Sequence, residues 1–320
     1  GMSGSAIADT CGIGYMATEA MIKKGFNKPF SAALTISSAI VGPVIPPSIP
    51  MVMYAVISGT SLGALFLGGI IPGLLISLSL SIYCYVVAEK YHFPKSERPS
   101  LAQLFAAFKA AFFPLMTPVI LLTGIYTGVF TPTEAAAVCT LYALIVGLIM
   151  NRDMGVKDLI PIGRNVLIQT GITMFVIASI NVFRWIIVRE RIPDLIANVV
   201  IQMSIPKPLM LALLNVILLA LGCFLPLTTI MLAFVPILLP ILPLLGIDLV
   251  HFGVVLIINL MIGLVMPPFG MQLFVIHGLT NIPISKIVEK VWPQLACVGI
   301  VLVLITYYEP LVLWLPNLMK

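Results

Sequence analysis

An apolar segment at residues 31–57 is interrupted at its centre by the stretch Gly42-Pro43-Val44-Ile45-Pro46-Pro47-Ser48-Ile49-Pro50. Proline has no amide donor and its ring clashes with the preceding turn, so four prolines within eight residues must unwind a helix. The whole segment is otherwise long enough to cross a bilayer, which takes about 20 apolar residues. The stretch therefore predicts a membrane-spanning helix that is broken near its middle.

A second apolar segment at 249–280 carries the same pattern, because Gly263-x-Val265-x-Pro267-Pro268 repeats Gly42-x-Val44-x-Pro46-Pro47. Before it, apolar arms of 13 and 14 residues at 209–221 and 230–243 flank the polar stretch Gly222-Cys223-Phe224-Leu225-Pro226-Leu227-Thr228-Thr229. Arms that are too short to cross predict a re-entrant hairpin with its tip at mid-membrane. The two breaks, each preceded by small hydroxyl residues, predict an internal repeat.

The composition excludes a soluble globular protein. Of the 320 residues, 60% are hydrophobic and 9% are charged, and the mean hydropathy is +1.15. A soluble domain carries roughly a quarter charged residues. The Lys and Arg residues are scattered between apolar segments, which sets membrane orientation and needs no nucleic-acid partner. The five widely spaced cysteines and the three histidines predict neither a disulfide framework nor a metal site.

Further helices are predicted at 6–22, 62–88, 114–130, 135–150, 165–188 and 294–316, with an interfacial helix at 101–113 and a connector at 189–207. This tracing places twelve of the 17 basic residues on one side: Lys23, Lys24, Lys28, Lys90, Lys95, Arg98, Lys109, Arg152, Lys157, Arg164, Lys286 and Lys290. Positive residues favour the cytoplasmic side. The two hairpins then open to opposite faces, so the repeats are predicted to be inverted. Arg189, Arg191 and Lys207 lie on the other side.

Unwound backbone is tolerated at membrane depth only where it is buried in protein or lines a polar cavity. Two hairpin tips that face two broken helices would bring carbonyls, hydroxyls and helix ends together near the midplane. Oxygen atoms suit a hard cation such as Na⁺, and helix N-termini suit an anionic group. The pattern therefore predicts a transport protein.

Five motifs occur in order along the chain: Ser3-Gly4-Ser5-Ala6-x-Ala8-Asp9, Gly42-Pro43-x-x-Pro46-Pro47-Ser48, Phe66-x-x-Gly69-x-x-Pro72-Gly73, Thr131-Pro132-Thr133-Glu134 and Pro267-Pro268-x-Gly270. Together they resemble the large membrane subunit of tripartite ATP-independent periplasmic (TRAP) transporters. The resemblance implies that an N-terminal part of a complete subunit, with the first arm of the first hairpin, precedes this sequence.

The resemblance implies an elevator-type transporter in the bacterial inner membrane that imports an organic acid, a sialic acid or a C4-dicarboxylate, with Na⁺. The implied partners are a soluble periplasmic binding protein, a small four-helix membrane subunit and membrane lipid. The expected fold is all-α, with inverted repeats, re-entrant hairpins and two broken transmembrane helices. Residues 1–57 and 208–280 would form the transport domain, and 58–207 and 281–320 would be mainly scaffold.

The family pattern also implies two Na⁺ sites. The first joins Ser3 to the carbonyls of Gly42, Ile45 and Pro47, and the second joins Gly222, Thr228, Gly263 and Met266. Many family members carry an acidic residue in the second tip where this chain has Pro226.

The candidate substrate-binding residues are Ser5, Asp9, Ser48, Thr229 and Arg184. Asp9 equally suits a helix N-terminus, and Arg184 equally suits snorkelling to the interface. Glu134 is better explained as part of a capping box. Asn259 and Gln272 could line a cavity or bond between helices.

Three rival functions have sequence support. A stand-alone Na⁺/divalent-anion elevator symporter would share the paired hairpins but would need no binding protein. A passive channel is a second rival. An intramembrane serine hydrolase could use Ser3, within Gly1-Met2-Ser3-Gly4, with His277 as its base. A catalytic dyad would not explain the repeated Gly-x-Val-x-Pro-Pro block.

Overall fold

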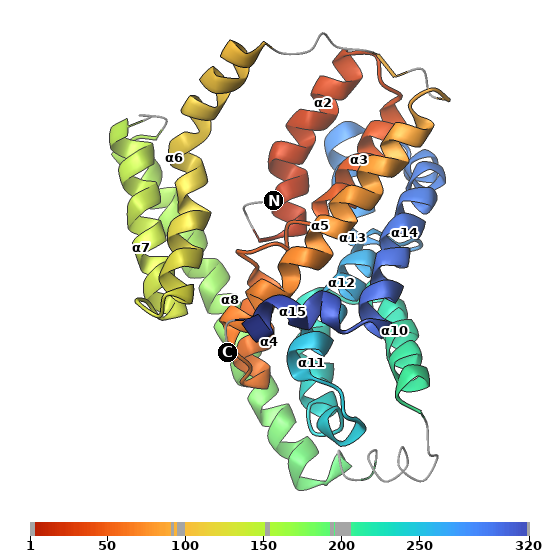
Figure 1. Cartoon of the computed structure of the whole chain (residues 1–320). Coiled ribbons are helices and arrows are strands. Elements are labelled where there is room, and N and C mark those ends of the chain that lie inside the picture. The colour runs from red at the N-terminus through yellow and green to blue at the C-terminus, as the bar shows by residue number, and fades with distance from the viewer. Residues whose placement is uncertain are drawn as a thin grey trace. The chain divides into compact units, whose positions relative to one another are not determined.

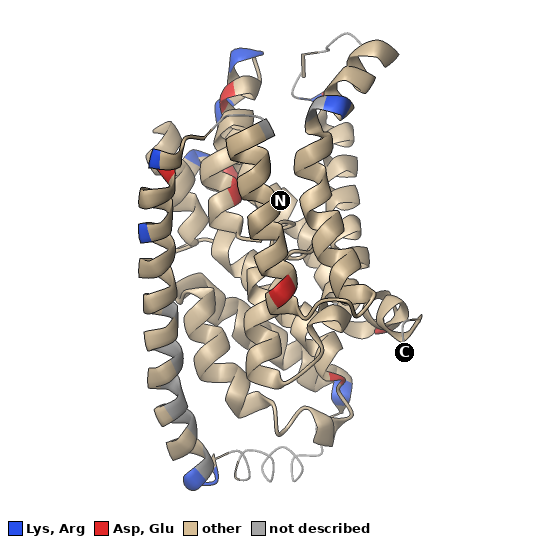
Figure 2. Cartoon of the chain, turned by 90° about the vertical axis from the view of Figure 1, so that its left-hand side faces the viewer, with Lys and Arg blue, Asp and Glu red and all other residues tan. Residues whose placement is uncertain are grey.

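A computed structural model describes residues 4–90, 93–94, 100–150, 154–192, 195 and 206–318 (Figure 1). All regular structure in these residues is helical, which confirms the predicted all-α class. Four described helices are long and apolar enough to cross a membrane: Leu62–Val87, Pro132–Ile149, Lys207–Phe224 and Ile284–Tyr307. Lys and Arg lie mostly towards the helix ends, with long uncharged stretches between them (Figure 2). The chain is an integral membrane protein by these criteria.

The chain divides into two compact units. The hairpin unit comprises Gly1–Pro94 and Ile186–Lys320, and the second unit comprises Lys95–Trp185. Each is described by itself below.

Both predicted helix breaks are present in the hairpin unit. Helix α3 (Lys28–Ala39) and helix α4 (Ile49–Ser58) are separated by residues 40–48. Helix α12 (Leu249–Val265) and helix α13 (Met271–Thr280) are separated by residues 266–270. Each break contains a cis peptide bond between its two adjacent prolines. The helices stop there because the prolines supply no amide donors for the next turn.

The centre of the hairpin unit is α12. Its start is fixed by Asp248, whose side chain accepts hydrogen bonds from the Val250 and His251 amides at 2.8 and 3.0 Å. Every residue from His251 to Val265 is buried. Helices α4, α5, α10 and α14 all pack against it. A helix that is apolar all round suits this surrounded position.

The second hairpin consists of α10 (Lys207–Phe224) and α11 (Leu227–Leu238), joined at Leu225 and Pro226 and followed by the short helix η4 (Pro243–Leu245). The prediction that both arms are too short to cross is wrong for α10, which has 18 residues and is apolar enough to cross. Its helix continues from Lys207 to Phe224 because no proline interrupts it between Pro208 and Pro226. The 12-residue α11 is short, as predicted.

The second arm of the first hairpin is a kinked helical run formed by α1 (Ala6–Asp9), η1 (Thr10–Gly14) and α2 (Tyr15–Lys23). The kink lies at Gly12, where φ is −90° and ψ is −105°. The predicted helix at 6–22 is therefore present, with a bend that its glycines permit.

Helix α5 (Leu62–Val87) packs against the first break through two glycines. A Cβ atom added to Gly69 would lie 2.3 Å from the Val44 carbonyl oxygen, and one added to Gly73 would lie 2.3 Å from the Ile45 side chain. The backbone of α5 can approach the break only because both residues lack a Cβ.

The last predicted span, at 294–316, is wrong in its bounds. Helix α14 (Ile284–Tyr307) ends earlier, and α15 (Pro310–Leu318) is a separate helix, because Pro310 cannot continue α14. Helices α5 and α14 belong to the hairpin unit and pack on each other and on α12. The unit boundaries therefore do not follow the predicted domain boundaries at 58 and 281, while the scaffold role itself stays a prediction.

The second unit contains α6 (Leu101–Tyr126), α7 (Pro132–Ile145), η2 (Val146–Met150), η3 (Val156–Asp158) and most of α8 (Leu159–Arg189). The two parts of α6, Leu101–Lys109 and Ala111–Tyr126, are bent by 57°. The bend lies between Lys109 and Ala111, close to the boundary that the sequence predicted between an interfacial helix at 101–113 and a span at 114–130. The Thr131 amide donates to Glu134 Oε2 at 2.8 Å, which confirms the predicted capping box.

Candidate functional site

The first hairpin tip contacts the first break at Gly4. The Ile49 amide donates a hydrogen bond to the Gly4 carbonyl at 3.3 Å. A Cβ atom added to Gly4, whose φ is +66°, would lie 2.7 Å from the Pro47 carbonyl oxygen. Only glycine fits both the left-handed backbone and this approach. Ser3, a predicted ligand, lies outside the described residues.

The second hairpin meets the second break through Gly222 and Gly263. A Cβ atom added to Gly263 would lie 2.7 Å from the Gly222 Cα and carbonyl carbon. Seven residues before Gly222, the Asn215 side chain accepts a hydrogen bond from Asn259 Nδ2 at 2.9 Å and donates one to Thr306 Oγ1 at 2.9 Å. These bonds join α10, α12 and α14. Asn259 is therefore an interhelical hydrogen-bonding residue, which sequence reasoning had left open.

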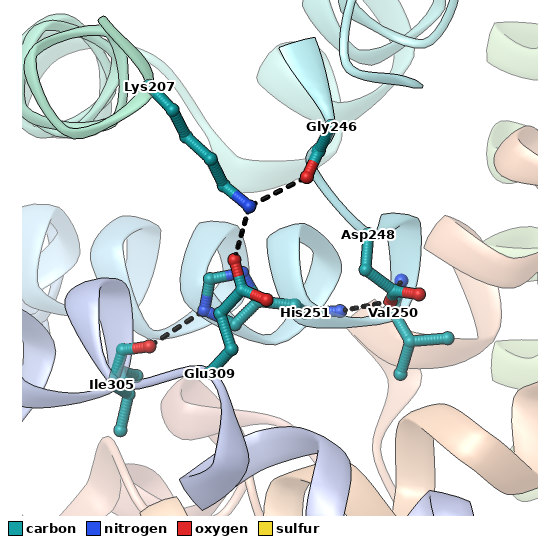
Figure 3. Close-up of polar contacts among 7 residues, drawn as sticks. All are labelled: Lys207, Gly246, Asp248, Val250, His251, Ile305 and Glu309. Atoms are coloured by element: carbon teal, nitrogen blue, oxygen red, sulfur yellow. Dashed lines mark hydrogen bonds and ion pairs between the residues drawn. The ribbon is translucent and has the colours of Figure 1, made fainter. Parts of the chain in front are cut away.

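Lys207 holds the N-terminal end of α10. Its Nζ lies 2.5 Å from Glu309 Oε1 and donates to the Gly246 carbonyl at 2.6 Å (Figure 3). Beside it, His251 Nε2 lies 2.7 Å from the Ile305 carbonyl (Figure 3). The Lys207 contacts join the start of α10 to the turn after η4 and to the turn between α14 and α15, and the His251 contact joins α12 to α14.

Several backbone carbonyls at the tips and breaks take part in no hydrogen bond among the described residues. They are those of Gly42, Ile45, Pro47 and Gly222. The carbonyls of three glycines lack their helical hydrogen bond for the same reason. Gly42, Gly222 and Gly263 are each followed, four residues later, by a proline. The helical donor for a carbonyl comes from the residue four ahead, and proline has none. The Gly263 carbonyl receives the Met266 amide at 3.2 Å instead.

These carbonyls include all three backbone positions of the first predicted Na⁺ site and one, Gly222, of the second. An oxygen with unused lone pairs is a ligand for a hard cation, and a buried one costs free energy until it finds a partner. The Met266 carbonyl accepts from the Gly270 amide at 3.0 Å and retains its second lone pair. The donor set therefore fits Na⁺ at both predicted positions.

Both hairpin tips and both broken helices surround one cavity of about 200 Å³. Its lining residues are Gly4, Ser5, Ala6, Ile7, Pro43, Ile49, Pro50, Met53, Pro226, Leu227, Thr228, Met261, Leu264 and Met271. Segments more than 200 positions apart in the sequence therefore meet here. The two tips and two breaks that sequence reasoning paired therefore line one cavity.

Four helix N-termini converge on this cavity. The lining includes first-turn residues of the run 6–23, of α4, of α11 and of α13. Each helix N-terminus carries a partial positive charge and unpaired amide groups. No acidic side chain is among the lining residues. The cavity therefore has a positive potential that suits an anion, without a basic side chain in its described wall.

The other candidate residues are distributed as follows. Ser5 and Thr228 line the cavity, whereas Thr229 does not; both threonines are exposed. Ser48 is buried; its hydroxyl donates to the Pro43 carbonyl and accepts from the Met51 amide at 3.2 Å. Asp9 lines a separate cavity of about 660 Å³ between α2, α3 and α5. Arg184 is on α8, and its side chain lies outside the described part of the chain.

Gln272, in the first turn of α13, is fully buried, and neither of its amide atoms has a hydrogen-bond partner among the described residues. His277 lies at the other end of α13, where its Nδ1 is 2.7 Å from the Ile282 carbonyl. The histidine ring is therefore engaged in the local turn.

Comparisons with known proteins match nearly the whole chain to one family of transporters. The model of the family "Tripartite ATP-independent periplasmic transporter, DctM component" matches residues 1–311. The sialic acid TRAP transporter large permease SiaM of Vibrio cholerae is 40% identical over 99% of this chain and 74% of its own length. The C4-dicarboxylate permease DctM of Pseudomonas aeruginosa is 37% identical, with the same two shares.

A further relative is the isethionate TRAP transporter permease DctMQ of Oleidesulfovibrio alaskensis. It is 36% identical over 96% of this chain, which spans about half of that protein, 48%. Because the family match and the SiaM and DctM relatives extend over nearly the whole sequence, the chain belongs to the DctM component family of tripartite ATP-independent periplasmic transporters and is a transport permease, not an enzyme.

Proposed function

We propose that the protein imports an organic acid across the bacterial inner membrane, coupled to Na⁺. The observation that carries this proposal is the single cavity at which two hairpin tips, two helix breaks and four helix N-termini meet. Unused carbonyls lie at the same breaks. An anion and a cation would therefore bind close together, and each would favour the other.

The proposed mechanism follows from these contacts. Na⁺ binds the carbonyls of Gly42, Ile45 and Pro47 at one break, and those near Gly222 and Gly263 at the other. Each ion draws a tip onto its break and so completes the wall of the cavity around the acid. The hairpins and broken helices then move as one block, as in an elevator. Coupling requires that Na⁺ binds the acid-loaded state more tightly than the empty state.

The relatives' names support the choice of partners and substrates. A tripartite periplasmic system implies a soluble periplasmic binding protein and a small membrane subunit beside this permease. Sialic acid and C4-dicarboxylates are the first acids to test, because they name the SiaM and DctM relatives. The two proposed Na⁺ sites would supply the free energy for uphill transport, since the family name excludes ATP as its source.

Two rival functions predict different results. A stand-alone Na⁺/divalent-anion symporter would need no binding protein, and a passive channel would give no uptake against a gradient. The hydrolase alternative is disfavoured because the relatives that match nearly the whole chain are permeases.

The test is uptake of radiolabelled acid into proteoliposomes that contain the complete complex, with and without a Na⁺ gradient and the binding protein. Thr228→Val, at the cavity wall, is expected to lower uptake strongly. Thr229→Val is the matched control, because Thr229 is exposed like Thr228 but does not line the cavity. Uptake that needs neither Na⁺ nor the binding protein would refute the proposal. Equal effects of the two variants would show that the acid does not bind at the Thr228 side of this cavity.

A further inference from the structure

A groove runs along the hairpin unit between α10 and α14. Both helices pack on α12, but they make few contacts with each other in the part of the chain that the structure describes. Residues of both helices line the groove, together with Ile262 of α12 and Met266 of the second break. A Cβ atom added to Gly299, in the α14 wall, would meet no atom within 4 Å. The groove is therefore open, and it shares no lining residue with the cavity at the hairpin tips.

The groove lies at the depth of the hydrocarbon core. Its α14 wall extends from Trp292 to Tyr307, which are 15 positions apart, or about 22 Å along a helix. The hydrocarbon core of a bilayer is about 30 Å thick, so the groove fits within it. Trp and Tyr are enriched where this core meets the head groups. An open apolar groove at this depth is filled by hydrocarbon.

The polar groups of the groove wall are already paired. The Asn215 side chain, which lines the groove, donates to Thr306 Oγ1 and accepts from Asn259 Nδ2, both at 2.9 Å. The Tyr307 hydroxyl donates to the Pro208 carbonyl at 3.4 Å. Helices associate in membranes partly through hydrogen bonds between them. The wall instead offers mainly dispersion contacts, which a flexible acyl chain makes along its whole length.

One end of the groove continues into a charged hollow. Tyr307 lines both, and Lys207 and Glu309 line the hollow. Lys207 Nζ contacts Glu309 Oε1 and the Gly246 carbonyl, which leaves one of its three N–H groups unused. The second oxygen of Glu309 accepts no hydrogen bond from a described residue. Because the two side chains are 34% and 33% exposed, a donor and an acceptor are accessible side by side.

This pair of charges distinguishes among lipid head groups. A phosphate accepts from the ammonium of Lys207, and a primary amine donates to the carboxylate of Glu309. A glycerol head group has the phosphate but no cation to face Glu309. A choline head group has no N–H to donate. Only a head group with both a phosphate and a primary amine pairs with both side chains.

We infer that the groove between α10 and α14 binds one acyl chain of a phospholipid of the ethanolamine type, whose head group lies at Lys207 and Glu309. The bound lipid bridges the first arm of the second hairpin and α14, and so stabilises the hairpin unit. This inference is independent of the acid that is transported and of the two Na⁺ sites.

The first experiment measures thermal unfolding of the detergent-solubilised complex with added dioleoyl phosphatidylethanolamine, phosphatidylglycerol or phosphatidylcholine. The three lipids have the same acyl chains, so they differ only in their head groups. A ligand of the folded state raises the unfolding temperature according to its affinity. Phosphatidylethanolamine is expected to raise it most. Equal rises for the three lipids, or the largest rise with another lipid, would overturn the head-group assignment.

A pair of variants tests the charged end, each compared with its own lipid-free unfolding temperature. Glu309→Gln is expected to weaken phosphatidylethanolamine binding about two- to fivefold and to leave phosphatidylglycerol binding no weaker. Glu289→Gln is the matched control, because Glu289 is an exposed carboxylate on α14 that lines neither the groove nor the hollow. An unchanged lipid preference in Glu309→Gln, or the same change in both variants, would refute the role of Glu309.

A second pair tests the groove. Gly299→Leu places an aliphatic side chain where the acyl chain lies, so it is expected to weaken the binding of all three lipids. Gly171→Leu is the control, because Gly171 is an exposed helical glycine on α8 with equally open space around it. Equal lipid binding by the two variants would show that the chain does not lie in the groove.

Photo-cross-linking identifies the occupant in the native membrane. Val303 lines the groove and is 54% exposed, so a benzoylphenylalanine at this position reacts with whatever fills it. An adduct with a phospholipid supports the inference. An adduct with the small membrane subunit, or with another segment of this chain, would show that a protein helix covers the groove and would overturn it.

Discussion

Pro226→Ala tests whether a proline keeps the Gly222 carbonyl available for Na⁺. In the structure, Leu225 is extended, with φ −114° and ψ 144°, as expected for a residue before proline. The Gly222 carbonyl has no hydrogen bond among the described residues, because residue 226 has no amide hydrogen. Alanine at 226 removes both restrictions, so α10 can extend and the new amide can donate to Gly222.

The size of the effect follows from this one hydrogen bond. Its net contribution is about 1 kcal/mol, and Na⁺ must break it to use the carbonyl. A penalty of about 1 kcal/mol lowers affinity roughly fivefold. The assay is the Na⁺ concentration that gives half-maximal thermal stabilisation of the complex, which is expected to rise roughly fivefold.

A second proline supplies the control for this experiment. Pro236 lies inside α11, and the carbonyl four residues before it belongs to Leu232, outside both predicted Na⁺ sites. Pro236→Ala should leave the Na⁺ dependence unchanged. The reasoning fails if Pro226→Ala has normal Na⁺ dependence, or if both variants shift it equally.

Three further changes probe how α10 is held. Gly263→Ala places a Cβ 2.7 Å from the Gly222 backbone and should lower the free energy of unfolding by about 1–3 kcal/mol, measured by thermal unfolding; unchanged stability would contradict the close contact. Asn259→Leu removes the bond to Asn215 and should cost about 1–2 kcal/mol, measured in the same way. A double-mutant cycle with Lys207→Met and Glu309→Gln should give a coupling of about 1 kcal/mol or less, because both side chains are about a third exposed.

The breaks and the second tip could be predicted because proline acts through local geometry. Pro43 and Pro267 remove donors whatever surrounds them, so the sequence alone predicts that helices end near them, as α3 does at Ala39 and α12 at Val265. The pairing of each tip with its break also followed from sequence order, since the repeat gave two copies of one arrangement.

Other features depended on packing between distant segments. The extent of α10 was underestimated, because the end of an apolar run does not show where a helix stops without a proline or a cap. The hydrogen bond between Asn215 and Asn259 depends on which faces of α10 and α12 meet, and periodicity does not give this in a helix that is apolar all round. For Gln272, the neighbouring sequence did not show whether its side chain is buried between helices, as in the structure, or lines a cavity.

Ser48 is the candidate residue for which sequence and structure suggest different roles. The sequence offered it as a substrate ligand, but in the structure its hydroxyl is buried, donates to the Pro43 carbonyl and caps the Met51 amide. An N-cap contributes about 1 kcal/mol to stability. Ser48→Ala should therefore lower the free energy of unfolding by about that amount, measured by thermal unfolding, and leave acid affinity unchanged. Ser48→Thr retains the hydroxyl and should keep most of the cap. A loss of acid binding in Ser48→Ala at full stability would restore the ligand role, because a cap cannot affect affinity without first affecting the helix that it begins.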